Sequence, residues 1–87
     1  MAYTVRFKPS AARAVRKLPW EVQARIFAKT DDLERDPRPP GVENLWGAEN
    51  HYRVRVGDYR IVYEVRDRIL LVLVVRVAHR REAYRGL

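Results

Sequence analysis

The 87-residue sequence contains no cysteine, and this absence excludes disulfide bonds, thiol nucleophiles and cysteine-ligated metal sites. Small secreted domains usually depend on such cross-links, so we expect a cytoplasmic protein. The two histidines, His51 and His79, have no carboxylates at a recognised metal-ligand spacing, and we expect neither a metal nor another cofactor. The longest apolar run, Ile69–Val75, is far shorter than the roughly 20 residues that a membrane helix needs.

Acidic residues are few relative to basic ones, with 11 Asp and Glu against 18 Lys and Arg and a net charge of +7. This balance favours a polyanionic partner. Most of the cations are arginines, which bind phosphate in a bidentate manner better than lysines do. A chain of this length accommodates one domain, which we expect to span residues 1–87.

Motifs of several enzyme classes are missing. The sequence has no Gly-rich phosphate loop, no HExxH zinc motif, no Gly-x-Ser-x-Gly turn and no carboxylate pair at a spacing typical of acid–base catalysis. Chemistry in this chain would therefore depend on arginine, tyrosine and histidine.

Two helices follow a short strand in the first half of the chain. Alternating apolar and polar residues predict the strand over residues 3–8, and helical spacing predicts helices over 10–18 and from Trp20 to about Arg35. Pro19 separates the helices and makes them a hairpin. We expect the tryptophans, Trp20 and Trp46, to be partly buried anchors.

Three strands follow the proline-rich loop Asp36–Gly41. Their alternating or continuous apolar residues place them at His51–Val56, Tyr59–Arg66 and Ile69–Ala78. The order β-α-α-β-β-β predicts an α+β domain in which the helical hairpin packs on one face of a small, mostly antiparallel four-stranded sheet.

The turn Gly57-Asp58 fixes how its two flanking strands pair. A two-residue turn with glycine first suits type II′ and places Arg55 directly opposite Arg60, with Cβ atoms about 5 Å apart. Arg53 shares their face, and the apolar residues of both strands share the other. Like charges so placed cost up to about 1 kcal/mol, which an anion between them would offset. Each arginine alone is adequately explained by solubility, but their convergence favours phosphate binding.

The last strand extends this pattern. Period two places Arg76 and Arg80 on one face, which we expect to be the arginine face, and His79 on the other. Tyr84 follows closely, where it would act as a general base or stack on an RNA base, although a terminal tyrosine is more often a packing residue. His79 also has a simpler interpretation as an exposed residue at a strand end.

Several segments of the sequence resemble the RelE/ParE toxin superfamily. They are Asn44-Leu45-Trp46-Gly47, Tyr52-Arg53-Val54-Arg55, Gly57-Asp58-Tyr59-Arg60-Ile61-Val62-Tyr63 and the ending Val77-Ala78-His79-Arg80-Arg81-Glu82-Ala83-Tyr84. The ending, with its arginine and tyrosine, resembles the RelE branch. The resemblance covers nearly the whole chain and includes the order of elements.

This resemblance implies a toxin of a type II toxin–antitoxin pair that cleaves messenger RNA in the ribosomal A site without a metal. A 2′-hydroxyl would attack the neighbouring phosphate and leave a 2′,3′-cyclic phosphate. By position in the motifs, Arg53 and Arg55 would hold the RNA backbone, Arg60 would contact the scissile phosphate, Arg80 would stabilise the transition state and Tyr84 would be the general base.

The implied site has further members and partners. We expect Arg76, Arg81 and His79 to lie along the RNA as well. The partners would be the 70S ribosome, messenger RNA and an acidic antitoxin that forms a hetero-oligomer with the toxin; no membrane is involved.

Departures from the family pattern leave two questions open. Arginines replace the lysines that the best-known branch carries on its second strand, which excludes a base role at Arg53 and Arg55. The interval from Arg80 to Tyr84 is shorter than in that branch, so His79 is an alternative proton carrier. An alternative function is that of a ParE-like inhibitor of DNA gyrase that performs no chemistry; a basic nucleic-acid-binding module without toxicity is a third.

Overall fold

The computed structural model describes residues 2–45, 47 and 49–83. Its elements follow in the order β1 (Thr4–Phe7), α1 (Pro9–Arg16), α2 (Trp20–Arg35), β2 (Glu43–Asn44), β3 (His51–Val56), β4 (Tyr59–Arg66), the 3₁₀ turn η1 (Asp67–Ile69), β5 (Leu71–His79) and α3 (Arg80–Ala83). Among the residues described, no helix has the length and apolar character needed to cross a membrane.

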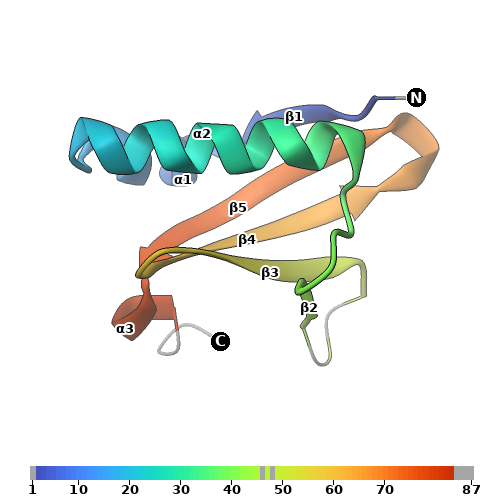
Figure 1. Ribbon diagram of the computed structural model, residues 1–87. Coiled ribbons are helices and arrows are strands. Elements are labelled where there is room, and N and C mark those ends of the chain that lie inside the picture. Colours follow the sequence, from blue (N-terminus) through green and yellow to red (C-terminus); the bar gives the residue numbers. More distant parts are fainter. Residues whose placement is uncertain (1, 46, 48, 84–87) are drawn as a thin grey trace.

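The strands form one mixed sheet in the order β1-β5-β4-β3-β2. β1 runs parallel to β5, and the other neighbouring pairs are antiparallel. Helices α1 and α2 lie together along one face of the sheet, while α3 lies at the end where β5 terminates (Figure 1). The α+β class, the relative order of the six predicted elements and the helical hairpin on one face are confirmed.

The expected count of four strands is wrong, because β2 adds a fifth at the edge beside β3. β2 has only two residues, too few to show an alternating pattern in the sequence. The last strand also begins later than expected, at Leu71. Residues 67–69 form the 3₁₀ turn instead, and Leu70 has a positive φ of 51°, which ends that turn before the strand starts.

The prolines set the helix boundaries. Pro9 occupies the first turn of α1, where its missing N–H costs no hydrogen bond, and Pro19 immediately precedes α2. The apolar side of α2 faces the sheet through Ile26 and Leu33, both fully buried. Each such side chain stabilises the fold by about 1.5–3 kcal/mol relative to its exposed state.

The expectation of a partly buried Trp20 is wrong, because this residue is 74% exposed at the start of α2. It precedes the first residue of α2 that packs on the core, Val22, and so lies outside the apolar stripe. Trp46 lies outside the described residues.

The proline-rich loop is fastened to the sheet by two tyrosines and one ion pair. The buried Tyr63 hydroxyl donates a hydrogen bond to the Pro37 carbonyl at 2.7 Å. The Arg38 guanidinium binds both Asp67 oxygens, at 3.0 and 2.9 Å, and its Nε donates to the Tyr52 hydroxyl at 2.8 Å. We refer to the Arg38–Asp67 pair as the distal clamp.

Tyr3 completes the distal clamp from the first strand's side. Its hydroxyl donates to Asp67 at 2.7 Å, so residues far apart in the sequence meet at the turn after β4. The pKa of Asp67 falls to about 2, chiefly because of the hydrogen bonds from Arg38 and then that from Tyr3. The clamp therefore holds the sheet end farthest from the Gly57-Asp58 turn.

Candidate nucleic-acid interface

The hairpin between β3 and β4 has the predicted register. Val56 pairs with Tyr59 and Arg55 with Arg60 across the turn Gly57-Asp58. Gly57 has a φ of +57°, and a Cβ there would meet an Arg25 guanidinium nitrogen at 3.3 Å. Glycine therefore suits both the backbone conformation and the close approach of α2.

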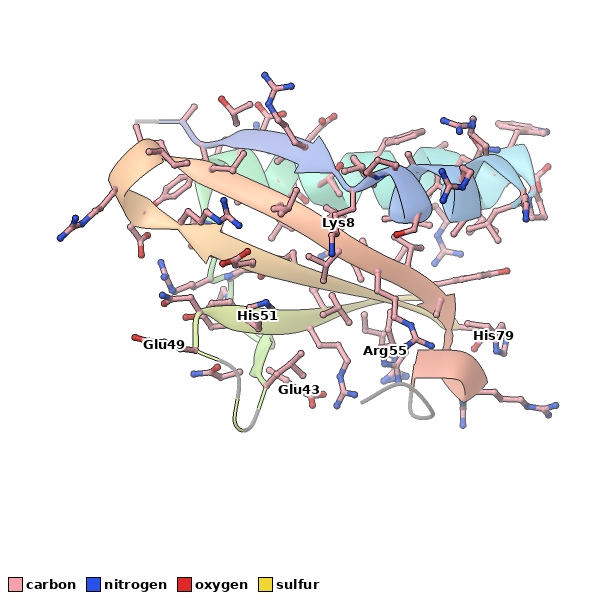
Figure 2. All side chains as sticks on the ribbon, turned by 180° about the vertical axis from the view of Figure 1, so that it is seen from behind. Lys8, Glu43, Glu49, His51, Arg55 and His79 are labelled. Atoms are coloured by element: carbon pink, nitrogen blue, oxygen red, sulfur yellow. The ribbon has the colours of Figure 1, made fainter. Side chains whose placement is uncertain are left out.

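The pairing of β3, β4 and β5 places arginines of all three strands on the same face of the sheet. Arg53 pairs with Val62, and Val62 pairs with Arg76 on β5; Arg55 pairs with Arg60, and Arg60 pairs with Ala78. Because directly paired residues share a face, the four arginines lie on the side away from α1 and α2. Figure 2 views the sheet from this side, with Arg55 labelled. We call this set the arginine face: Arg53, Arg55, Arg60 and Arg76.

The members of the arginine face differ in exposure. Arg55 is exposed, whereas Arg60 is only 9% exposed. The sequence predicted the position of Arg60 correctly but gave no sign of its burial, which comes from the neighbouring strands on both sides. Its Nη1 donates a long hydrogen bond, 3.4 Å, to the Tyr59 carbonyl.

A carboxylate that the sequence analysis missed lies on the same face. Glu43 on β2 pairs with Arg53, and its Oε2 accepts a hydrogen bond from Arg53 Nη2 at 2.6 Å. The hydrogen bond and charge of Arg53 lower the pKa of Glu43, and the charge of Arg60 adds to the effect. Only the pairing of a two-residue strand reveals this contact, so no sequence period could have found it.

Lys8 is a second residue that the analysis missed. It follows β1, is exposed, and its backbone N–H donates to the Val74 carbonyl at 2.9 Å. Figure 2 shows its side chain on the open side of the sheet. The alternation in residues 3–8 places Lys8 opposite to the buried side of β1, so the sequence did contain this signal.

At the end of β5, His79 turns to the helix side of the sheet, as period two predicted. It pairs with Tyr59, and the two rings meet edge to face with centroids 5.4 Å apart. Its Nδ1 accepts a 3.4 Å hydrogen bond from the Arg81 backbone N–H. These contacts direct the imidazole away from the arginine face.

Arg80 starts α3 at the hairpin turn. Its backbone N–H donates to the Asp58 carbonyl at 2.6 Å, which fixes the start of α3 beside the turn between β3 and β4. Both Arg80 and Arg81 are exposed, and with Asp58 and His79 they line a hollow of about 430 Å³. Tyr84, the expected general base, lies outside the described residues.

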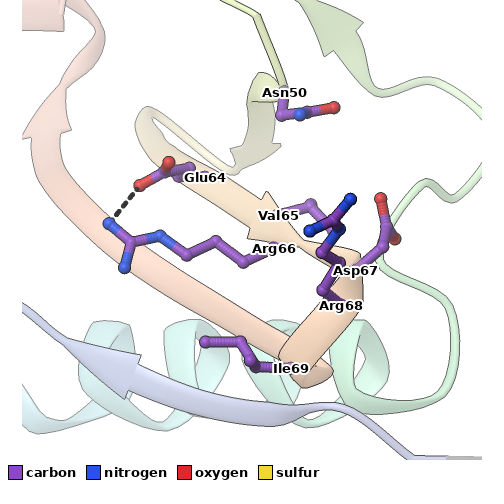
Figure 3. Close-up of a pocket in the computed structure, with 7 residues that line it drawn as sticks. All are labelled: Asn50, Glu64, Val65, Arg66, Asp67, Arg68 and Ile69. Atoms are coloured by element: carbon purple, nitrogen blue, oxygen red, sulfur yellow. Dashed lines mark hydrogen bonds and ion pairs between the residues drawn. The ribbon is translucent and has the colours of Figure 1, made fainter.

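A second hollow, of about 390 Å³, lies at the other end of β4 (Figure 3). It is lined by Asn50, by residues 64–68 and by the exposed Ile69, and the ion pair between Arg66 and Glu64 at 3.1 Å forms part of its wall. Among the described residues, none of those expected in a catalytic site lines it. Within the described part of the chain, no group of three or more histidines and carboxylates could hold a metal ion.

Comparison with known proteins gives a consistent result. A family model described as the ParE toxin of the type II toxin–antitoxin system parDE matches residues 5–84. The chain is 35% identical over 86 residues to Toxin RelG of Mycobacterium tuberculosis, with 98% of this chain and 99% of RelG covered.

Two solved structures show the same fold. The archaeal RelE–RelB complex from Pyrococcus horikoshii contains a chain that is 29% identical, with a TM-score of 0.82 and coverage of 92% of this chain and 97% of that chain. The intact RelBE toxin–antitoxin complex of E. coli gives 29% identity, a TM-score of 0.81 and coverage of 90% and 96%, respectively.

Proposed function

This chain belongs to the RelE/ParE superfamily of type II toxin–antitoxin toxins, where its relatives place it with the RelE-like branch, and from that premise we propose that it is a ribosome-dependent messenger RNA endonuclease. The observation that carries the proposal is the arginine face, in which cations from β3, β4 and β5 converge by register. Such a cluster suits a polyanion whose phosphates are evenly spaced.

The proposed reaction is an internal phosphoryl transfer. The 2′-hydroxyl loses its proton to a base, its oxygen bonds to the adjacent phosphorus, and the bond from phosphorus to the 5′-oxygen breaks. The products are a 2′,3′-cyclic phosphate and a 5′-hydroxyl, which receives a proton. Negative charge gathers on the phosphoryl oxygens in the transition state, and fixed guanidinium groups stabilise it without reorganising.

Individual residues receive roles by their positions in the family motifs. Arg60 would contact the scissile phosphate from within the sheet, and Arg80 would stabilise the transition state and assist the leaving group. Tyr84 would accept the 2′-hydroxyl proton. Arg53 and Arg55 would hold the RNA backbone.

Three more residues would support RNA binding. Arg76 extends the arginine face onto β5, and Arg81 and His79 adjoin the hollow beside Arg80. The cations among these residues position phosphates and carry little sequence information, so codon preference would come from elsewhere.

The proposed partners are an acidic antitoxin, the 70S ribosome and messenger RNA, in the cytoplasm. The solved relatives from Pyrococcus horikoshii and E. coli are complexes of RelE with RelB, which supports an antitoxin here. A chain with a net charge of +7 offers charge complementarity to an acidic segment that becomes ordered on binding.

Inhibition of DNA gyrase is the second candidate, because the matching family model is that of ParE toxins. Induced expression followed by mapping of transcript ends and of DNA breaks distinguishes the two. The nuclease gives new 5′-hydroxyl ends within translated codons and intact DNA, whereas a gyrase poison gives broken DNA and intact transcripts. Arg68→Ala should behave like the unaltered protein in both assays and serves as the control for loss of one arginine, because Arg68 is exposed and lines the hollow at the far end of β4.

A further inference from the structure

The carboxylate of Glu43 is held against the arginine face from both sides of its short strand. Residues of the flanking loop bond to each other and to β3: Val42 N–H donates to the Pro39 carbonyl at 3.2 Å, and Leu45 N–H donates to the His51 carbonyl at 2.9 Å. Val42 packs against the core, so alternation turns Glu43 to the open side. The backbone therefore directs the Glu43 side chain to the open side of the sheet.

The side chain of Arg53 is less exposed than that of Glu43. The Arg53 side chain is 14% exposed and that of Glu43 is 63% exposed, with 2.6 Å between Nη2 and Oε2. An approaching phosphate would thus meet the carboxylate first. Carboxylate and phosphate oxygens bind a guanidinium nitrogen in the same way, so the two compete for this donor.

We propose that Glu43 is an internal phosphate mimic that occupies Arg53 until the RNA backbone displaces it. Glu43 is then a positioning residue that acts through Arg53. Because of Glu43, a ligand must contact the protein through more phosphates before the ligand can bind Arg53. Short or isolated anions do not displace the carboxylate, whereas an RNA strand that already contacts Arg55 and Arg60 does. The inference rests on the proposed function for the identity of the ligand.

The test measures binding of a single-stranded RNA with 2′-O-methyl groups, which lacks the attacking hydroxyl and is not cleaved. We expect Glu43→Gln to tighten binding about 2- to 5-fold at 0.1 M salt, the size of one exposed ion pair. Because no displaced carboxylate then remains beside the phosphates to offset the charge of Arg53, the slope of log K against log salt steepens by up to about 0.7. On programmed ribosomes KM falls while kcat is unchanged.

Glu64→Gln is the matched control. Glu64 lies on the same open side of the sheet and binds Arg66 at 3.1 Å, so its removal changes the net charge equally but leaves the pair of Arg53 intact. We expect it to change the slope less than Glu43→Gln does. The effect of Glu43→Gln should vanish when Arg53→Gln is also present.

Equal slopes for Glu43→Gln and Glu64→Gln, or weaker binding by Glu43→Gln, would overturn the inference. The second result would mean that Glu43 holds Arg53 in its binding position rather than masking it. Absence of transcript cleavage by the unaltered protein, with the binding results as expected, would refute the proposed nuclease and leave the phosphate mimic standing.

Discussion

Arg55 on β3 and Arg60 on β4 lie directly opposite each other, two cations in register across an antiparallel pair. Neither forms an ion pair with a carboxylate in the part of the chain that the structure describes. Such a pair costs up to about 1 kcal/mol in the absence of a ligand. An anion between the two guanidinium groups would convert this repulsion into attraction, so the pair suits anion binding better than it suits folding alone.

We predict that Arg60→Gln and Arg80→Ala each abolish growth arrest in an otherwise folded protein. Loss of one transition-state contact slows cleavage roughly 10²- to 10³-fold. Glutamine keeps the part of the largely buried Arg60 stem that fills the sheet face, whereas the exposed Arg80 can be truncated to alanine. Growth curves at matched expression measure the effect, and circular dichroism verifies folding. Full toxicity of both variants would contradict the assigned roles.

Lys8→Ala should weaken RNA binding without changing its sequence preference. Its ammonium group lies on the open side of the sheet, where it extends the cations of the arginine face toward β1 (Figure 2). Loss of one phosphate contact reduces the salt slope by about 0.7 for single-stranded RNA. Fluorescence anisotropy at several salt concentrations measures the slope, and Lys29→Ala on α2 is the control. An unchanged slope would exclude Lys8 from the interface.

The distal clamp should make the stability of the fold depend on pH in the acidic range. The folded-state pKa of Asp67, about 2, lies below its ordinary value of 3.8. The stabilisation by its ionised form is therefore complete above about pH 4 and is lost as the pH falls toward 2. Asp67→Asn should lower the melting temperature at pH 7 and lessen its decline in acid. Asp32→Asn removes a more exposed pair with Arg35 and should have little effect. If the melting temperatures of Asp67→Asn and of the unaltered protein fell equally as the pH was lowered, the result would argue against the clamp.

The proton carrier is tested by comparing Tyr84→Phe with His79→Gln. Because the His79 ring packs against Tyr59 on the helix side, we expect His79→Gln to have the smaller effect on the rate of cleavage. Tyr84→Phe should slow cleavage about 10²-fold or more, the usual contribution of a general base, while RNA binding persists. Single-turnover cleavage on programmed ribosomes measures both rates. A rate for Tyr84→Phe equal to that of the unaltered protein would remove the tyrosine from the mechanism.

Local signals in the sequence were sufficient for much of the fold. The proline at the start of each helix and the Gly57-Asp58 turn are local features with strong backbone preferences. They gave the bounds of α2, β3 and β4 as well as the pairing of Arg55 with Arg60. Three residues of the arginine face, Arg53, Arg55 and Arg60, follow from that register alone. The place of Arg76 on the same face also requires the pairing of β4 with β5.

The features that were missed depend on contacts between distant residues. β2 forms only because Glu43 and Asn44 pair with residues of β3. Arg60 is buried only because β3 and β5 lie on either side of it. The sheet also contains an irregularity after Val62, where the pairing with β5 shifts by one residue. No period in the sequence encodes such a shift, because period-two patterns describe single strands and not their partners.

The position of β5 has a consequence for synthesis of the protein. This strand is made last among the strands, yet it lies between β1 and β4, and Thr4 pairs with Leu71. A nascent chain that lacks β5 leaves β1 without a neighbour and one edge of β4 open, so the domain cannot close during translation. Nascent chains arrested before Leu71 should be cut by a protease that spares the complete chain. The fold is therefore completed only after β5 has left the ribosome.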